Sequence, residues 1–214
     1  MGQAMRAAHM DVSNTVDVTD PVAVARAVRA ILHARYPLED FSPVDVLASD
    51  LASLYRGDMP GFSACDIGYH NLQHVLDVTL AMARLIAGHE AQPGAVGTLG
   101  PQLALAGVAA ALFHDSGYIR RTHDSRHKNG AEYTRVHVRR SARFLAEYLP
   151  QVGLGQIADA CSRIVYFTSY GTDPRTLPVA SEQERRAGAL LGTADLIAQM
   201  ADVNYLSNCR DKLY

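Results

Sequence analysis

The feature that most constrains this chain is an apolar segment, residues 101–113, that ends directly in His114 and Asp115. The segment has no charged residue, and its apolar side chains would cover nearly the whole surface of a helix, which predicts a helix at the buried centre of a bundle. An imidazole and a carboxylate at the end of such a helix can build a functional site. They are equally compatible with an ordinary helix end, where histidine favours the negative end of the dipole and aspartate begins a turn.

The composition favours an all-helical protein. Hydrophobic residues make up 48% of the 214 residues, Ala and Leu are abundant and Trp is absent. Runs of β-branched and aromatic residues are rare, so helices are favoured over strands. This length suits one domain with a sizeable core. The net charge of −2 excludes a global attraction to nucleic acid or anionic lipid.

The cysteines and the apolar runs indicate the compartment. Cys65, Cys161 and Cys209 lie far apart and show neither the CxxC spacing of a zinc knuckle nor a disulfide framework, which suits a reducing environment. The N-terminal residues lack a signal-peptide core, and the most apolar run, residues 103–113, is too short to span a bilayer. We therefore expect a cytoplasmic protein without a membrane partner.

Capping residues and apolar periodicity predict six to eight helices in one domain. Residues 1–18 are expected to be a flexible N-terminal tail, and residues 19–214 to form the helical domain. The expected helices cover about 20–34, 42–56, 69–88, 101–113, 130–149, 156–168 and 182–202. Residues 205–214 still have an amphipathic pattern, so we expect the natural chain to continue beyond Tyr214.

Seven of the nine histidines fall between residues 70 and 137. His70 and His74 are four residues apart on the expected helix 69–88, so both rings would share one face and could converge on a metal, or on a metal and a substrate. In most helices two such histidines are surface or core residues, so this pair alone is a weak indication. Zinc proteases carry Glu directly after the first His, whereas this chain has Asn71, which excludes that class.

Asp195 is a single carboxylate within the apolar helical stretch 190–200. A buried, unpaired carboxylate costs several kcal/mol, and no Lys or Arg stands at helical spacing to pair with it. Asp195 therefore either faces solvent or meets positive charge from elsewhere in the fold, such as a metal ion. The resulting set consists of His74, His114, Asp115 and Asp195. Its imidazoles and carboxylates suit Mn, Fe, Ni, Mg or Zn as the divalent metal.

A histidine, a His-Asp pair and a final Asp on successive helices resemble the HD-domain superfamily of metal-dependent phosphohydrolases. Residues 69–78, YHNLQHVLDV, also resemble the YHNxxHxxDV signature of the class I cyclic nucleotide phosphodiesterases, and residues 192–197, GTADLI, are similar to the final Asp motif. The resemblance covers about residues 65–210 and implies a single-domain HD-type helical bundle. It further implies that His70 is the general acid and that the first metal has four ligands: His74, His114, Asp115 and Asp195.

Two features depart from the family's patterns. Many members carry Lys in HDxGK, and the cyclic-nucleotide enzymes carry His in HDxxHxG, whereas Tyr118 occupies this position here. His137 is placed like a ligand of a second metal, but residues 164–169 contain no further histidine. We therefore expect one ion rather than two, and cyclic nucleotides are one of several compatible substrates.

A basic cluster follows His114 and Asp115, which we call the HD pair. Eight Lys and Arg residues stand between positions 120 and 143, and only Asp124 and Glu132 oppose them. A solvated helix face accounts for about half of such a cluster. The members in the loop are Arg120, Arg121, Arg126 and Lys128. We expect them to bind a substrate phosphate, because Arg suits bidentate contact to such groups.

Together these features predict a metal-dependent phosphohydrolase that hydrolyses a phosphomonoester or phosphodiester of a nucleotide or cyclic nucleotide. A metal-activated water would attack, Asp115 would hold that water and His70 would protonate the leaving oxygen. The expected partner is a small phosphate ester and not a nucleic acid polymer, and a homodimer is compatible with the sequence. Two alternatives stay open: a di-iron oxygenase, which needs a complete second iron site, and a nucleotide- or metal-binding sensor without turnover.

Overall fold

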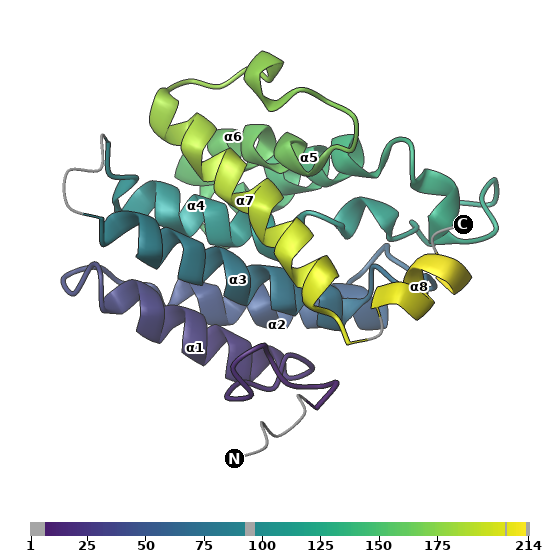
Figure 1. Ribbon diagram of the computed structural model, residues 1–214. Helices are drawn as coiled ribbons and strands as arrows, with labels where there is room; N and C mark the ends of the chain where they lie inside the picture. The colour runs from purple at the N-terminus through teal and green to yellow at the C-terminus, as the bar shows by residue number, and fades with distance from the viewer. Residues whose placement is uncertain (1–6, 93–96, 204, 213–214) are drawn as a thin grey trace.

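The computed structural model describes residues 7–92, 97–203 and 205–212. These residues form α-helices and short 3-10 turns and no strand, which confirms the expected all-α single-domain bundle (Figure 1). None of the helices in these ranges combines the length and the apolar character that crossing a membrane requires. The helices are α1 (Pro21–His33), α2 (Pro43–Arg56), α3 (Leu72–Glu90), α4 (Gly100–Phe113), α5 (His137–Tyr148), α6 (Gly155–Ile164), α7 (Glu182–Ala201) and α8 (Tyr205–Lys212).

Helix α4 lies at the centre of the bundle, as its apolar composition predicts. Every residue from Ala104 to Phe113 is buried, and the helix packs against α2, α3, α6 and α7. In Figure 1, α1 and α2 lie below α3 and α4, α5 and α6 lie above, and α7 crosses in front of them. The HD pair therefore follows the most buried helix directly into the interior.

Helix α3 begins at Leu72 and not at Tyr69. Asn71 is its N-cap residue, with an extended backbone and a side-chain oxygen that accepts the backbone N–H of His74 at 3.0 Å. His70 therefore lies in the turn before the helix. The expectation that His70 and His74 share one helical face is wrong, because the Asn71 cap fixes the first turn after His70.

The expected helix 130–149 is divided in the structure. Gly130–Tyr133 forms a 3-10 turn, the N–H of Val136 donates to the carbonyl of Tyr133 at 2.7 Å, and α5 then begins at His137. The expected helix 156–168 likewise consists of α6 and the 3-10 turn Val165–Thr168. The first division matters for the site, because it places His137 at the start of a helix and not within one.

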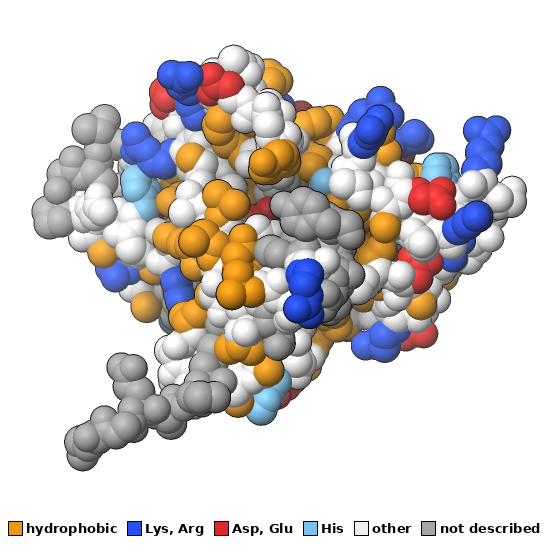
Figure 2. Space-filling model, turned by 45° about the vertical axis from the view of Figure 1, so that its right-hand side comes forward, with side chains coloured by type: hydrophobic (Ala, Val, Ile, Leu, Met, Phe, Trp, Pro, Cys, Tyr) orange, Lys and Arg blue, Asp and Glu red, His pale blue; other side chains and the backbone are white. Residues whose placement is uncertain are grey.

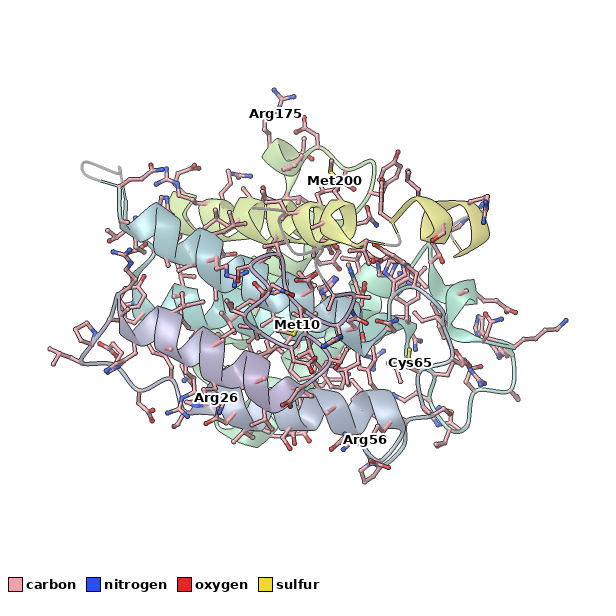
Figure 3. All side chains as sticks on the ribbon, turned by 60° about the horizontal axis from the view of Figure 1, so that its bottom comes forward. Met10, Arg26, Arg56, Cys65, Arg175 and Met200 are labelled. Carbon is pink, nitrogen blue, oxygen red and sulfur yellow. The ribbon has the colours of Figure 1, made fainter. Side chains whose placement is uncertain are left out.

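Residues 7–18 fold back on the bundle, although the sequence had indicated a flexible tail there. Val18 is fully buried, and Asp11 pairs with Arg84 of α3 at 2.6 Å. The carboxylate of Asp11 also accepts three backbone N–H groups of its own loop, in which Met10 is labelled in Figure 3. These contacts with α3 are distant in sequence, so local composition did not reveal them. Residues 1–6 lie outside the described residues.

Candidate metal centre

Imidazoles and carboxylates from four parts of the chain converge beyond the end of α4. The turn before α3 and its first turn each supply a histidine, the end of α4 supplies the HD pair, and α5 and α7 each add one residue. All of the residues that the sequence analysis assigned to the metal or to proton transfer belong to this group: His70, His74, His114, Asp115, His137 and Asp195.

Asp115 is the centre of this cluster. Its Oδ2 atom lies 2.9 Å from His70 Nδ1, 3.2 Å from His114 Nε2 and 3.7 Å from His74 Nε2. Its Oδ1 atom lies 3.8 Å from His137 Nε2. Burial alone would raise the pKa of Asp115, but the charges of His114 and His70 and the hydrogen bond with His70 hold it well below its usual range. The carboxylate is therefore ionised and can bind a cation.

Asp195 of α7 closes the opposite side of the cluster. Its Oδ1 atom lies 3.3 Å from His74 Nε2 and 3.9 Å from His114 Nε2. No Lys or Arg of α7 stands at helical spacing from Asp195, but His74 of α3 and His114 at the end of α4 can supply positive charge. Burial alone would raise the pKa of Asp195, but the nearby ring of His74 and the charge of His114 lower it.

Two ring nitrogens in this cluster are buried without a partner. Within the described part of the chain, neither His74 Nε2 nor His114 Nε2 makes a hydrogen bond. The Nδ1–H of His114 donates to the carbonyl of Ala111 at 2.8 Å, so a neutral ring directs its unprotonated Nε2 into the cluster. An unsatisfied buried nitrogen is costly, and an ion would remove that cost.

The spacing of the donor atoms fits a divalent ion. The distances from these two nitrogens to the facing oxygens of Asp115 and Asp195 run from 3.2 to 3.9 Å. Four ligands around a tetrahedral ion with bonds of about 2.1 Å stand about 3.4 Å apart. Two overlapping sets of three side chains meet the spacing of metal ligands, namely His74, His114 and Asp195, and His70, His74 and Asp115.

Protons compete with an ion for this site. Burial alone would lower the pKa of His114, but the carboxylates of Asp115 and Asp195 raise it to about 9. A ring nitrogen must lose its proton before it binds a metal, so metal binding releases protons here. The carboxylates of Asp115 and Asp195, which favour the protonated form of His114, are also the groups that would bind a cation.

Tyr118 packs against both of the histidines that flank Asp115. Its ring is stacked with that of His70 at a centroid distance of 4.7 Å and with that of His137 at 4.2 Å. The Nδ1–H of His137 donates to the carbonyl of Thr134 at 2.7 Å, which leaves Nε2 for Asp115. A buried aromatic ring thus contacts both of the histidines beside Asp115.

Gly117 allows this close packing between the HD turn and α5. A Cβ atom at Gly117 would collide with the backbone carbonyl of His137. The carbonyl of Gly117 accepts from Arg140 Nε at 2.6 Å, and its N–H donates to Ser141 Oγ at 2.9 Å. The first turn of α5 is thereby fixed against the turn that carries Asp115.

The cluster opens into a cavity of about 1000 Å³. His70, Asp115 and Asp195 reach it from the cluster, and the remaining walls are the start of α5, the segment 166–172 and one face of α7. Figure 2 shows a small recessed acidic patch on this face, with hydrophobic side chains beside it. A small molecule can therefore approach the candidate metal ligands from one side.

The four basic residues expected to clamp phosphate do not line this cavity. Arg120 pairs with Asp66 at 2.9 Å, and the guanidinium of Arg121 lies 3.9 Å from the centre of the Phe62 ring. An isolated β-bridge between Phe62 and Arg121 joins their loop to the segment after α2. The other two expected residues, Arg126 and Lys128, are exposed in the same loop.

Other residues form the cavity wall, and sequence reasoning did not single them out. Arg135 and Arg139 flank His137 at the start of α5, and three aromatic residues line the opposite segment. The sequence offered one indication of them, because Arg135 and Arg139 are each two residues away from His137. The aromatic residues are Tyr166, Phe167 and Tyr170.

Comparison of the chain with family models, with curated proteins and with solved structures finds no match. The functional inference therefore depends on the site itself. Its decisive features are the two partnerless nitrogens, the two ionised carboxylates that face them, and the cavity that gives access to them.

Proposed function

We propose that this protein is a metal-dependent phosphohydrolase of the HD-domain type that hydrolyses a phosphate ester of a nucleotide. The observation that carries the proposal is the pair of buried, partnerless nitrogens, His74 Nε2 and His114 Nε2, facing Asp115 and Asp195 within 3.9 Å. Structural metal sites are closed by protein ligands, whereas this cluster reaches a cavity that has room for water and substrate.

A divalent ion held by these four residues would supply Lewis-acid chemistry, which would activate water and offset charge on phosphoryl oxygens. The chain's own residues then have distinct tasks. Asp115 is ionised and faces the cavity, so it can accept a hydrogen bond from the attacking water and orient it. His70 Nδ1 lies 2.9 Å from Asp115 Oδ2, so its Nε2 is the nitrogen left to donate a proton to the leaving oxygen.

The di-iron oxygenase alternative receives less support from the geometry. Both sets of side chains with ligand spacing in the described residues include His74, so they overlap on one position. His137 Nε2 faces a single carboxylate, that of Asp115, and its ring is packed against Tyr118. One ion accounts for the cluster without a second site.

The test is the metal content of protein purified without chelator, measured with hydrolysis of a phosphodiester reporter on the same samples. The variants are Asp195→Ala and, as a matched control, Asp159→Ala, whose carboxylate is exposed on α6. Wild type and control should hold about one ion per chain and hydrolyse the reporter, and Asp195→Ala should lose both. Metal without turnover would support the sensor alternative, and no metal even after reconstitution would overturn the site.

A further inference from the structure

Arg135 and Arg139 reach the same cavity as the metal cluster. Both are exposed, and neither pairs with a carboxylate or makes a side-chain hydrogen bond within the described ranges. Other arginines of this protein contrast with them, because Arg120, Arg143 and Arg163 each pair with an acidic side chain. The cavity wall thus carries two positive charges without an anionic partner from the described chain.

The first turn of α5 adds to the positive character of this wall. Residues 134–139 line the cavity without a gap, and they include the helix start at His137. The turn contains no acidic residue, and Val136 provides no side-chain cap. Neither of these usual acceptors is therefore available to the backbone N–H groups at the positive end of the helix. Two guanidinium groups beside a helix N-terminus form a suitable site for a phosphate or carboxylate.

The rest of the cavity indicates what the anion is attached to. The opposite segment contributes Tyr166, Phe167 and Tyr170 to the cavity lining; the ring of Phe167 is packed against α7, whereas Tyr170 is fully exposed. Aromatic faces of this kind stack on nucleobases. At about 1000 Å³ the cavity is far larger than one phosphate requires, and it falls at the upper end of the range for drug-sized ligands.

We propose that Arg135 and Arg139 bind a second anionic group of the substrate, so that the substrate is a nucleotide with a further phosphate besides the one that is hydrolysed. The cluster around Asp115 receives the reacting phosphate, the start of α5 holds the second one, and the aromatic segment takes the base. The assignment of the reacting phosphate rests on the proposed function, but the binding of the second phosphate requires no turnover.

The test compares two probes, adenosine 5′-monophosphate and adenosine 3′,5′-bisphosphate, by equilibrium calorimetry on manganese-loaded and on chelated protein. The variant is Arg135→Gln/Arg139→Gln, and the control is Arg126→Gln, an exposed arginine that does not line the cavity. Wild type and control should prefer the bisphosphate by at least about tenfold, and the double variant should lose that preference, because hydrogen bonds to charged groups are the strong ones. An equal preference in wild type and double variant, or none in wild type, would overturn the proposal.

The outcome is separable from that of the proposed function. If no sample binds metal or hydrolyses the reporter, loss of the bisphosphate preference in the double variant still establishes the anion site. If hydrolysis occurs but the preference for the bisphosphate does not depend on the arginines, the proposed phosphohydrolase is supported and the second phosphate site is rejected. In an active enzyme the double variant should raise KM for bisphosphate substrates, whereas the Arg126→Gln control should keep the KM of wild type. Both arginines are exposed, so their replacement does not disturb the core.

Discussion

The ring of Tyr118 is stacked with the ring of His137 at a centroid distance of 4.2 Å and an interplanar angle of 15°. The same ring is stacked with His70 at 4.7 Å and 21°. One buried aromatic side chain therefore contacts both the proposed general acid and the histidine that would begin a second metal site. We infer that Tyr118 positions these rings around Asp115.

Replacing Tyr118 by Leu should therefore impair catalysis while metal binding persists. Without the aromatic face, the ring of His70 loses its support, and kcat should fall about tenfold or more because a small misplacement of a catalytic group is costly. KM and the metal content should change little. Tyr118→Phe retains the ring and should restore kcat, which a general loss of stability would not explain. Equal impairment of both variants would show that the hydroxyl matters and not the stacking.

Metal binding should stabilise the fold, because the ligands come from α3, from the end of α4 and from α7. An ion present at about a hundredfold its Kd would raise the unfolding free energy by about 2.7 kcal/mol. Thermal unfolding with added Mn²⁺ and after chelation measures this difference. His114→Ala should abolish the metal-dependent shift, whereas Asp159→Ala should keep it. A shift of equal size in His114→Ala would mean that the ion binds elsewhere.

The pH dependence of stability should reveal the folded N-terminal loop. Burial alone would raise the pKa of Asp11, but hydrogen bonds from Ser13 and from the backbone of Val16, together with Arg84, hold it well below its usual range. A carboxyl whose pKa is depressed in the folded state contributes stability above its unfolded pKa of about 4 and loses it as the pH falls. The contribution is therefore complete at neutral pH.

Asp11→Asn should lower the unfolding free energy by about 2 kcal/mol at neutral pH, because Arg84 loses its ionised partner. The difference from wild type should shrink as the pH falls below about 4. Urea titrations of wild type, Asp11→Asn and the exposed control Asp159→Asn measure both effects. An unchanged stability at neutral pH would indicate that residues 7–18 contribute nothing to the fold.

The sequence predicted the features that depend on local pattern. The uncharged run of α4 predicted its central position, and the lone carboxylate Asp195 in an apolar helix predicted that positive charge must come from elsewhere; the structure places His74 and His114 beside it. Features that depend on distant partners were not predictable. Arg120 looked available for phosphate, but Asp66 binds it from a loop far earlier in the chain.

The difference between the expected and the observed start of α3 has a local cause. Apolar periodicity extends to residues before the helix, but the side chain of Asn71 caps it and so decides where it begins. The shift leaves the identity of the candidate residues unchanged, since His70 still reaches Asp115 from the preceding turn. Geometry within the cluster thus depended on a single capping hydrogen bond that the residue spacing did not reveal.

Gly117 and Gly88 should respond in opposite ways to replacement by alanine. A Cβ at Gly117 would meet the backbone carbonyl of His137, which cannot move without displacing the start of α5. Gly117→Ala should therefore lower the unfolding free energy by about 1–3 kcal/mol and reduce metal content, because overpacking separates the HD turn from α5. Gly88 is exposed on α3 with open space around it, so Gly88→Ala should raise stability by about 0.5–1 kcal/mol.

Denaturant unfolding and metal analysis of these two variants together test how tightly the site is built. Gly88→Ala adds the same methyl group to the same protein, so it controls for any general effect of the substitution. If Gly117→Ala keeps full stability and full metal content, the turn after Asp115 can move relative to α5. The arrangement of His137 and Tyr118 around Asp115 would then be loose, and the positioning role inferred for Tyr118 would fail with it.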